Sequence, residues 1–193
     1  MSEDDGGASP APLREGKYAR IERERRFLLA APPPDLAAST ARRMSDRYLT
    51  GTRLRLRQVE HLATGAREYK LTQKIPADRP GAVQGLITNT YLSLAEYAVL
   101  SALPAAELSK VRFSVPPLGI DVFDPPLDGL VLAEVEFSTD AAALAFAQPA
   151  ASVAEVTSDG RFTGGSLARS GRSELAGWLA GFGVALRPGR PRG

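Results

Sequence analysis

Cysteine is absent from this 193-residue chain, and histidine occurs once, as His61. Without thiolates the chain can form neither disulfides nor iron–sulfur clusters nor thiolate zinc sites. A Ser-His-Asp hydrolase would depend wholly on His61, which lies in a polar stretch with no strained nucleophile elbow nearby. The catalytic chemistry of this chain, if it has one, must therefore come from carboxylates, cations and hydroxyl groups.

Long apolar runs and a strong charge of one sign are missing as well. No segment approaches the ~20 apolar residues that are needed to cross a bilayer. The start of the chain, with Glu3, Asp4 and Asp5, lacks the basic and apolar pattern of a signal peptide. The net charge is only +2, which does not suggest a surface that coats nucleic acid. We therefore expect a cytoplasmic protein that has no membrane partner.

The composition is that of one globular domain with less ordered ends. Hydrophobic residues make up 44% of the chain, which is ordinary for a folded protein of this length. Residues 1–16 are rich in Gly, Ser, Pro and Ala and predict a disordered leader, and residues 187–193 predict a flexible basic tail. The domain should therefore span residues 17–186.

Three stretches place like charges on one face of a strand. If Ile21–Leu29 is a β-strand, then Glu22, Glu24 and Arg26 share one face, because successive side chains point to opposite sides. Residues 131–137 place two glutamates on one face, and residues 53–57 place three arginines on one face. Alternating charge is also typical of the solvated face of a sheet. Charged faces that point inward must meet each other, a metal or an anion, because unpaired buried charge is costly.

The order of these stretches along the chain resembles a known family. Ile21–Leu29 is similar to the Glu-x-Glu-x-Lys strand of the CYTH superfamily, the triphosphate tunnel metalloenzymes. Further stretches resemble that family in the same order, so that the likeness covers about residues 17 to 170: Tyr48–Arg57, Tyr69–Lys74, Lys110–Phe113, Asp121–Phe123 with Glu134–Phe137, and Glu155–Ala168.

The sequence departs from the family pattern at a few positions. Arg26 stands where a lysine is usual, which keeps the charge but alters the geometry. Thr88 and Thr90 stand where we align a second Glu-x-Glu pair, and Gly164 replaces a usual asparagine. The resemblance leaves open whether these changes tune the activity or remove it, and how many metal ions bind.

The resemblance implies an α+β fold that is mainly antiparallel β: a closed eight-stranded barrel, or tunnel, with a charged interior and helices packed outside. It implies a metal-dependent triphosphatase that uses Mg²⁺ or Mn²⁺. The carboxylates that would hold metal are Glu22, Glu24, Asp121, Glu134 and Glu136. The cations that would bind phosphate are Arg26, Arg53, Arg55, Arg57, Lys74, Lys110 and Arg112, with Arg57 either beside the others or at the tunnel mouth.

The catalytic step is assigned to Glu22 and Glu24, which could orient the attacking water, while activation by the metal is the alternative. Inorganic tripolyphosphate is the first choice of substrate because it needs nothing beyond the charges, and ATP and thiamine triphosphate are further candidates. Nucleic acid is expected only through a 5′-triphosphate end. The alternatives are an adenylyl cyclase of class IV type and a nucleotide- or polyphosphate-binding module without turnover. A homodimer is left open.

Local patterns predict the remaining elements. Residues 46–59 are interpreted as one basic strand, and residues 35–44 as a short helix. Residues 94–103 are helix-like, with Ser93 as the N-cap, and residues 173–182 predict a last amphipathic helix with Trp178 in the core.

Overall fold

The computed structural model describes residues 15–78 and 80–186. Residues 1–14 of the predicted leader and the whole predicted tail, 187–193, lie outside the described residues. Nine strands are present in the described part of the chain: β1 (Arg20–Leu29), β2 (Arg42–Leu49), β3 (Leu54–His61), β4 (Arg67–Pro76), β5 (Val83–Leu92), β6 (Ala105–Val115), β7 (Leu118–Phe123), β8 (Val131–Glu136) and β9 (Ser152–Glu155).

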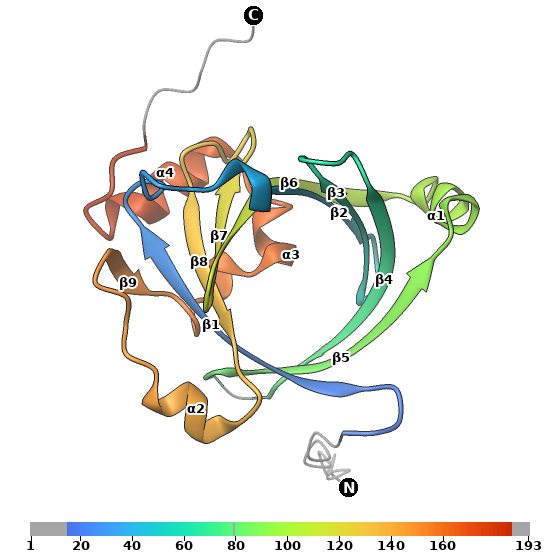
Figure 1. The fold of residues 1–193 in the computed structure, drawn as a ribbon, viewed down its shortest axis with the longest axis horizontal. Coiled ribbons are helices and arrows are strands. Elements are labelled where there is room, and N and C mark those ends of the chain that lie inside the picture. Colours follow the sequence, from blue (N-terminus) through green and yellow to red (C-terminus); the bar gives the residue numbers. More distant parts are fainter. Residues whose placement is uncertain (1–14, 79, 187–193) are drawn as a thin grey trace, which may run out of the picture.

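Eight of these strands close into an antiparallel barrel. Their order is β5-β4-β3-β2-β6-β7-β8-β1, and β1 also pairs with β5, which removes both free edges. Strand β9 pairs with the end of β1 outside the ring. Figure 1 views the barrel along its opening, with β1 and β5 crossing below it. The predicted closed eight-stranded barrel is confirmed.

Alternation along each strand decides which side chains enter the barrel. Strand β1 pairs with β8 so that Glu24 lies opposite Glu136 and Arg26 opposite Glu134. Because the side-chain period is two, these even-numbered residues share the inner face, and Arg23 and Arg25 point outward. The outward Arg25 donates to the Glu155 carboxylate over 2.9 and 2.6 Å. The inward orientation of the charged face of the first strand is therefore correct.

The interpretation of residues 46–59 as a single strand is wrong. This stretch forms a hairpin, in which β2 ends at Leu49 and β3 begins at Leu54. The turn contains Gly51 with φ of +72°, a left-handed conformation that glycine adopts without steric cost. Because the chain reverses at this turn, residues 50–53 do not continue the alternation of side chains between the two faces of a strand.

The helices are short, and two of the three predicted helices are present. Helix α1 (Leu94–Ser101) starts at a capping box in which Ser93 and Glu96 bond reciprocally. Helices α2 (Asp140–Ala145), α3 (Gly164–Leu167) and α4 (Arg172–Ala180) follow β8, and the predicted last helix is thus present. Residues 35–44 do not form the predicted helix. They hold only the 3₁₀ turn η1 (Ala38–Thr40), and β2 starts at Arg42.

The core has two parts, on the two faces of β1 and β8. On the outer face, Phe27 and Val135 pack with Phe146, which follows α2. On the inner face, Leu28 and Leu132 pack with the 3₁₀ turn η2 (Gly160–Phe162), α3 and α4. Trp178 of α4 contacts this inner cluster, as predicted. The segment η2–α3 thus fills one end of the barrel interior, and we call it the plug.

None of the helices in the described part of the chain combines the length and the apolar character needed to span a bilayer.

Candidate functional site

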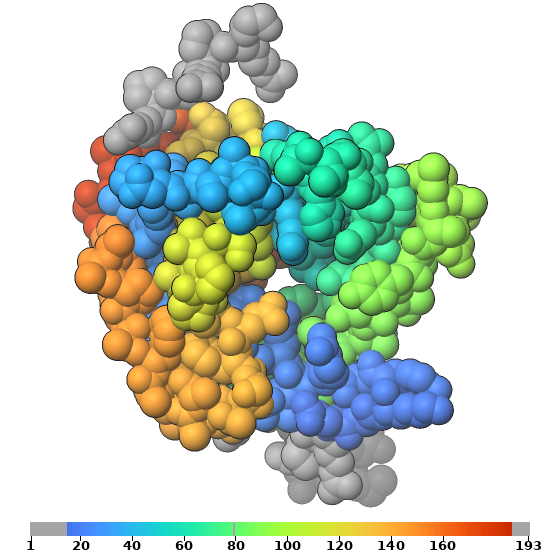
Figure 2. Space-filling view, in the orientation of Figure 1, coloured from blue at the N-terminus to red at the C-terminus, as the bar shows by residue number. Residues whose placement is uncertain are grey.

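A charged cavity of about 290 Å³ occupies the barrel interior. The space-filling view is hollowed near its centre, between the blue start of β1, the green of β5 and the yellow turn that joins β6 to β7 (Figure 2). The lining contains eight cations and four carboxylates. The cations are Arg20, Arg26, Arg55, Arg57, Lys70, Lys74, Lys110 and Arg112, and the carboxylates are Glu22, Glu24, Glu134 and Glu136.

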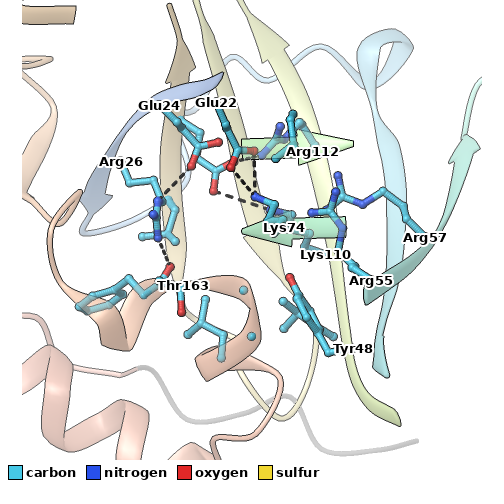
Figure 3. A pocket seen from close by; sticks show the side chains of 18 of the residues that line it. Glu22, Glu24, Arg26, Tyr48, Arg55, Arg57, Lys74, Lys110, Arg112 and Thr163 are labelled. Atoms are coloured by element: carbon cyan, nitrogen blue, oxygen red, sulfur yellow. Dashed lines mark hydrogen bonds and ion pairs between the residues drawn. The ribbon is translucent and has the colours of Figure 1, made fainter. Parts of the chain in front are cut away.

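Three of the four carboxylates face a cation at short range. Both oxygens of Glu22 accept from Lys74 Nζ, over 2.8 and 2.7 Å. Glu24 Oε1 lies 3.0 Å from Arg26 Nε, and Glu134 accepts a short hydrogen bond from Arg112. Figure 3 shows Glu22 and Glu24 on the same side of the cavity as Arg112, above the plug. The four carboxylates of the lining, which we call the acidic wall, are therefore already partly neutralised by cations of the chain itself.

Glu24 and Glu134 have opposite pKa shifts. Burial, the negative charge of Glu134 and that of Glu22 raise the pKa of Glu24 to about 7, although Arg26 and Lys74 oppose the rise. Burial would also raise the pKa of Glu134, but Lys110, Arg112 and Arg26 outweigh it and hold that pKa well below its usual range. At neutral pH Glu134 is ionised, and Glu24 is present in both protonation states.

The cations of β3 and β6 that line the cavity, which we call the basic wall, are held in position by buried partners. Arg57 donates from Nε and Nη2 to both oxygens of Asp46, over 2.5 and 2.6 Å, and only 2% of Asp46 is exposed. Burial alone would raise the pKa of Asp46, but Arg57 and Arg55 hold it below its usual range. Arg55 donates from Nη2 to Thr72 Oγ1 over 3.2 Å. Of the two positions left open for Arg57, the structure has the inner one, because the residue is buried beside Asp46 and lines the cavity.

Arg26 connects the acidic wall to the plug. It donates from Nη1 to the Phe162 carbonyl over 2.8 Å and from Nη2 to Gln84 Oε1. Its contact with Glu24 is an ion pair rather than a hydrogen bond, since Arg26 Nε has no hydrogen-bond partner among the described residues. These contacts need the three nitrogens of a guanidinium, which an ammonium group in the same position could not reproduce.

Two predicted site residues do not line the cavity. Arg53 is exposed in the turn before β3, because the hairpin ends the alternation that had grouped it with Arg55. Asp121 is fully buried behind the wall and accepts hydrogen bonds from Lys110 and from Arg112, the latter over 2.6 Å at each oxygen. Asp121 therefore holds two cations in place, and its oxygens do not face the cavity.

The structure brings all the other predicted metal-binding and phosphate-binding residues to the cavity, together with several that the sequence did not indicate. Lys70 lies on β4 in the same alternation as Thr72 and Lys74, and this spacing was the signal for it. On β5 the inward residues are Ile87 and Asn89, not Thr88 and Thr90, so our alignment of this strand was wrong by one residue. Strand β5 contributes no carboxylate to the lining.

Tyr48 and the plug close the cavity at its lower end in Figure 3. Burial raises the pKa of Tyr48 to about 12. A Cβ atom added at Gly164 would lie 1.9 Å from Tyr48 Oη, so the ring occupies space that any larger residue at 164 would need. Neither residue was predicted to pair with the other, because they lie on β2 and α3 and only the closed barrel brings them together.

The cavity lining offers carboxylate oxygens to a divalent cation. Carboxylate oxygens are the ligands that Mg²⁺ and Mn²⁺ prefer, and four carboxylates line the cavity. In residues 15–78 and 80–186, however, no three acidic or histidine side chains are grouped closely enough to hold a metal. The donor type fits a hard cation, which would compete with Lys74 at Glu22 and with Arg112 at Glu134.

Comparisons with known proteins agree with this architecture. No family model and no curated protein matches the chain. Among solved structures, the hypothetical protein NE1496 is 30% identical, with 78% of this chain and 99% of that chain covered and a TM-score of 0.51. A second structure, described as the inorganic triphosphatase NE1496, is 29% identical over 78% of this chain and 96% of that chain, also with a TM-score of 0.51. The PH1819 protein of Pyrococcus horikoshii OT3 is 14% identical over 62% and 79%, with a TM-score of 0.46.

These findings establish the family. The relative at 30% identity is covered over almost its whole length, and the chain has the closed eight-stranded barrel with Glu22 and Glu24 facing inward on its first strand. The chain belongs to the CYTH superfamily, the triphosphate tunnel metalloenzymes.

Proposed function

We propose that this barrel binds a linear triphosphate and hydrolyses one of its phosphoanhydride bonds. The observation that carries the proposal is the excess of cations in an enclosed cavity, with eight basic side chains against four carboxylates. A cavity of about 290 Å³ is at the small end of the range for ligand sites, which suits a compact anion. The neighbour described as an inorganic triphosphatase supports the same substrate class.

The basic wall would bind the phosphate groups. Arg55 suits this role because it makes one hydrogen bond, to Thr72, and its Nε has no hydrogen-bond partner in the described residues. Its guanidinium can therefore donate to phosphate oxygens without breaking an ion pair that is already optimal. Arg57 and Arg112 are fixed by Asp46 and Asp121, so their positive charge is oriented before the substrate arrives.

The carboxylates that would hold a divalent cation are Glu22, Glu24, Glu134 and Glu136. When bound, Mg²⁺ or Mn²⁺ would supply positive charge between these carboxylates and the phosphate oxygens, which would otherwise repel each other. Asp121 is not included, because its oxygens are occupied by Lys110 and Arg112.

Glu24 is the better placed of the two predicted catalytic residues. Both oxygens of Glu22 accept from Lys74, whereas burial raises the pKa of Glu24 to about 7 in the metal-free protein, so Glu24 can take up a proton near neutral pH when it is not itself holding the cation. In the proposed step, the oxygen of a water molecule bonds to a terminal phosphorus and passes a proton to Glu24. The bond from that phosphorus to the bridging oxygen breaks, its electrons stay on the bridging oxygen of the leaving diphosphate, and the attacked phosphorus leaves as orthophosphate.

Inorganic tripolyphosphate is the proposed substrate because charge alone is enough to recognise it. The test is phosphate release from tripolyphosphate, ATP and thiamine triphosphate, each with Mg²⁺, with Mn²⁺ and with EDTA. We expect release that depends on the metal and is fastest with tripolyphosphate. Absence of release from all three would reject the hydrolase, and formation of cyclic AMP from ATP would indicate a cyclase instead.

The residue assignment has its own test. Glu24→Gln and Glu136→Gln should each abolish turnover while the protein stays folded, because both substitutions keep the size and remove the charge. Asp35→Asn is the matched control, since Asp35 is exposed in the loop after β1 and does not line the cavity. Full activity in Glu24→Gln or Glu136→Gln would refute the metal assignment.

A further inference from the structure

Lys70 faces the same cavity as the predicted phosphate ligands. It lies on β4 two residues before Thr72 and four before Lys74, so all three side chains are on the inner face of the strand. Its cross-strand neighbour on β3 is Arg57, which belongs to the basic wall. The chain thus places Lys70 beside the wall that would bind phosphate.

Lys70 differs from the neighbouring cations in having no ionic partner. Lys74 is bound to Glu22, Lys110 to Asp121, and Arg57 to Asp46. In residues 15–78 and 80–186, the Lys70 ammonium group makes no hydrogen bond and no ion pair. The side chain is nevertheless half-buried, so it has lost part of its hydration without gaining an anion in return.

The electrostatic environment of Lys70 is unfavourable to its charge. Burial, together with the positive charges of Arg57 and Arg55 from β3, lowers the pKa of Lys70 to about 8, while Asp46 from β2 and Glu136 from β8 oppose the change. A phosphate group bound at this point would relieve the repulsion by the two arginines. Binding at Lys70 would also cost no existing ion pair, unlike binding at Lys74 or Lys110.

We propose that Lys70 is a substrate-contacting residue, whose ammonium group binds a phosphate of the triphosphate together with Arg55 and Arg57. This inference rests on the proposed function, because it names one more ligand of the same substrate. Lys70 should contribute more to the free energy of binding than the paired cations, because those cations must give up part of an internal contact to bind phosphate.

The test is calorimetric titration of tripolyphosphate into the full-length protein at pH 7 without added divalent ion, so that binding is measured apart from turnover. Lys70→Met removes the charge and keeps much of the length, and we expect affinity to fall by about tenfold to a hundredfold, as for a charged hydrogen bond. Lys70→Arg keeps the charge and should retain binding within about threefold of wild type.

The matched control is Arg67→Met. Arg67 precedes Lys70 on β4, is exposed on the outer face and pairs with Glu60. Its removal changes the net charge of the protein by the same amount, so a general electrostatic effect on an anion would appear in both variants. We expect Arg67→Met to change the affinity by less than about twofold. A loss of equal size in both methionine variants would overturn the assignment of Lys70.

A second readout uses pH. Because Lys70 loses its proton as the pH rises through about 8, wild-type affinity should fall between pH 7 and pH 9 more steeply than that of Lys70→Arg. Ionisation of Glu24 also weakens anion binding over this range, but it does so equally in both proteins. The difference between wild type and Lys70→Arg therefore isolates Lys70. Parallel pH profiles would contradict the proposed contact.

The outcomes separate this inference from the proposed function. If wild type binds tripolyphosphate and Lys70→Met binds it equally well, Lys70 is a solvated lysine, and the hydrolase proposal is unaffected. If wild type binds but releases no phosphate with any metal, the hydrolase is rejected, and the Lys70 contact is still decided by the variants. If wild type does not bind tripolyphosphate without a divalent ion, the Lys70 contact is rejected, and the hydrolase is decided separately by phosphate release in the presence of Mg²⁺ or Mn²⁺. Thermal unfolding of each variant confirms that it is folded.

Discussion

Replacing Glu24 by glutamine should stabilise this protein at neutral pH while removing its proposed activity. The side chain is 13% exposed and lies in a wall with Glu22 and Glu134. Burial and these neighbouring charges raise the pKa of Glu24 from its usual 4.5 to about 7. Folding therefore favours the protonated form of Glu24, and ionising it in the folded protein costs free energy.

The magnitude follows from the two pKa values. The folded state binds more protons than the unfolded state between pH 4.5 and about 7, so stability falls as the pH rises through this range. With 1.36 kcal/mol for each pH unit, the cost between pH 5 and pH 8 is about 2.5 kcal/mol. Glutamine is neutral throughout, so the Glu24→Gln protein escapes this loss.

The assay is urea unfolding of wild type and Glu24→Gln at pH 5 and pH 8, with Asp35→Asn as the control for loss of one exposed carboxylate. The free energy of unfolding of Glu24→Gln, relative to wild type, should rise by about 2.5 kcal/mol between the two pH values. Other groups that titrate in this range are shared and cancel in the difference. An equal difference at pH 5 and pH 8 would refute the raised pKa and the proton-accepting role that depends on it.

Two further predictions concern the supports of the site. Asp46→Asn leaves Arg57 buried without its carboxylate and should destabilise the protein by about 3–5 kcal/mol in urea unfolding at pH 7. The difference in the free energy of unfolding between wild type and Asp46→Asn should become smaller in acid. The stability that wild type gains from the lowered pKa of Asp46 is lost as the pH falls below the usual value of that pKa, 3.8. Gly164→Ala should cost about 1–3 kcal/mol, because its Cβ would lie 1.9 Å from Tyr48 Oη, and adding Tyr48→Phe should recover part of it. Gly165→Ala is the control, since the nearest atom to its Cβ would be 3.4 Å away; a loss as large as that of Gly164→Ala would contradict the steric argument.

The sequence was sufficient to predict which side chains share a face in most strands. A strand has only two faces, so the sequence alone was enough to put Glu22 with Glu24 on one face of β1 and Glu134 with Glu136 on one face of β8, and the family resemblance joined the two pairs. Ser93 was likewise predictable as a cap, because its hydroxyl and Glu96 form a local motif. These features depend on residues that are close in the chain.

The predictions from sequence were wrong where the structure depends on residues that are distant in the chain or on a turn that reverses the chain. Gly51 was the signal for the hairpin between β2 and β3, but the regular Arg-x-Arg pattern was taken to begin at Arg53, which still lies in the turn. Asp121 carries the same charge as the glutamates, and only the pairing of β7 with β6 sets it against Arg112. Ionic partners across a barrel are fixed by register, which a single sequence does not reveal.

The pairing of charges also explains why composition alone could not identify the reactive carboxylate. Glu22 and Glu134 look equivalent to Glu24 in the sequence, but Lys74 and Arg112 donate to them directly. Glu24 faces Arg26, whose nitrogens Nη1 and Nη2 already hold the plug and Gln84, so that its carboxylate is the least compensated of the three. Burial, and after it the negative charges of Glu134 and Glu22, raise the pKa of this carboxylate, which would therefore attract a cation or a proton. If Glu24→Gln leaves both turnover and the pH dependence of stability unchanged, then the pKa of Glu24 is not raised, and the proton acceptor must be sought at Glu136 instead.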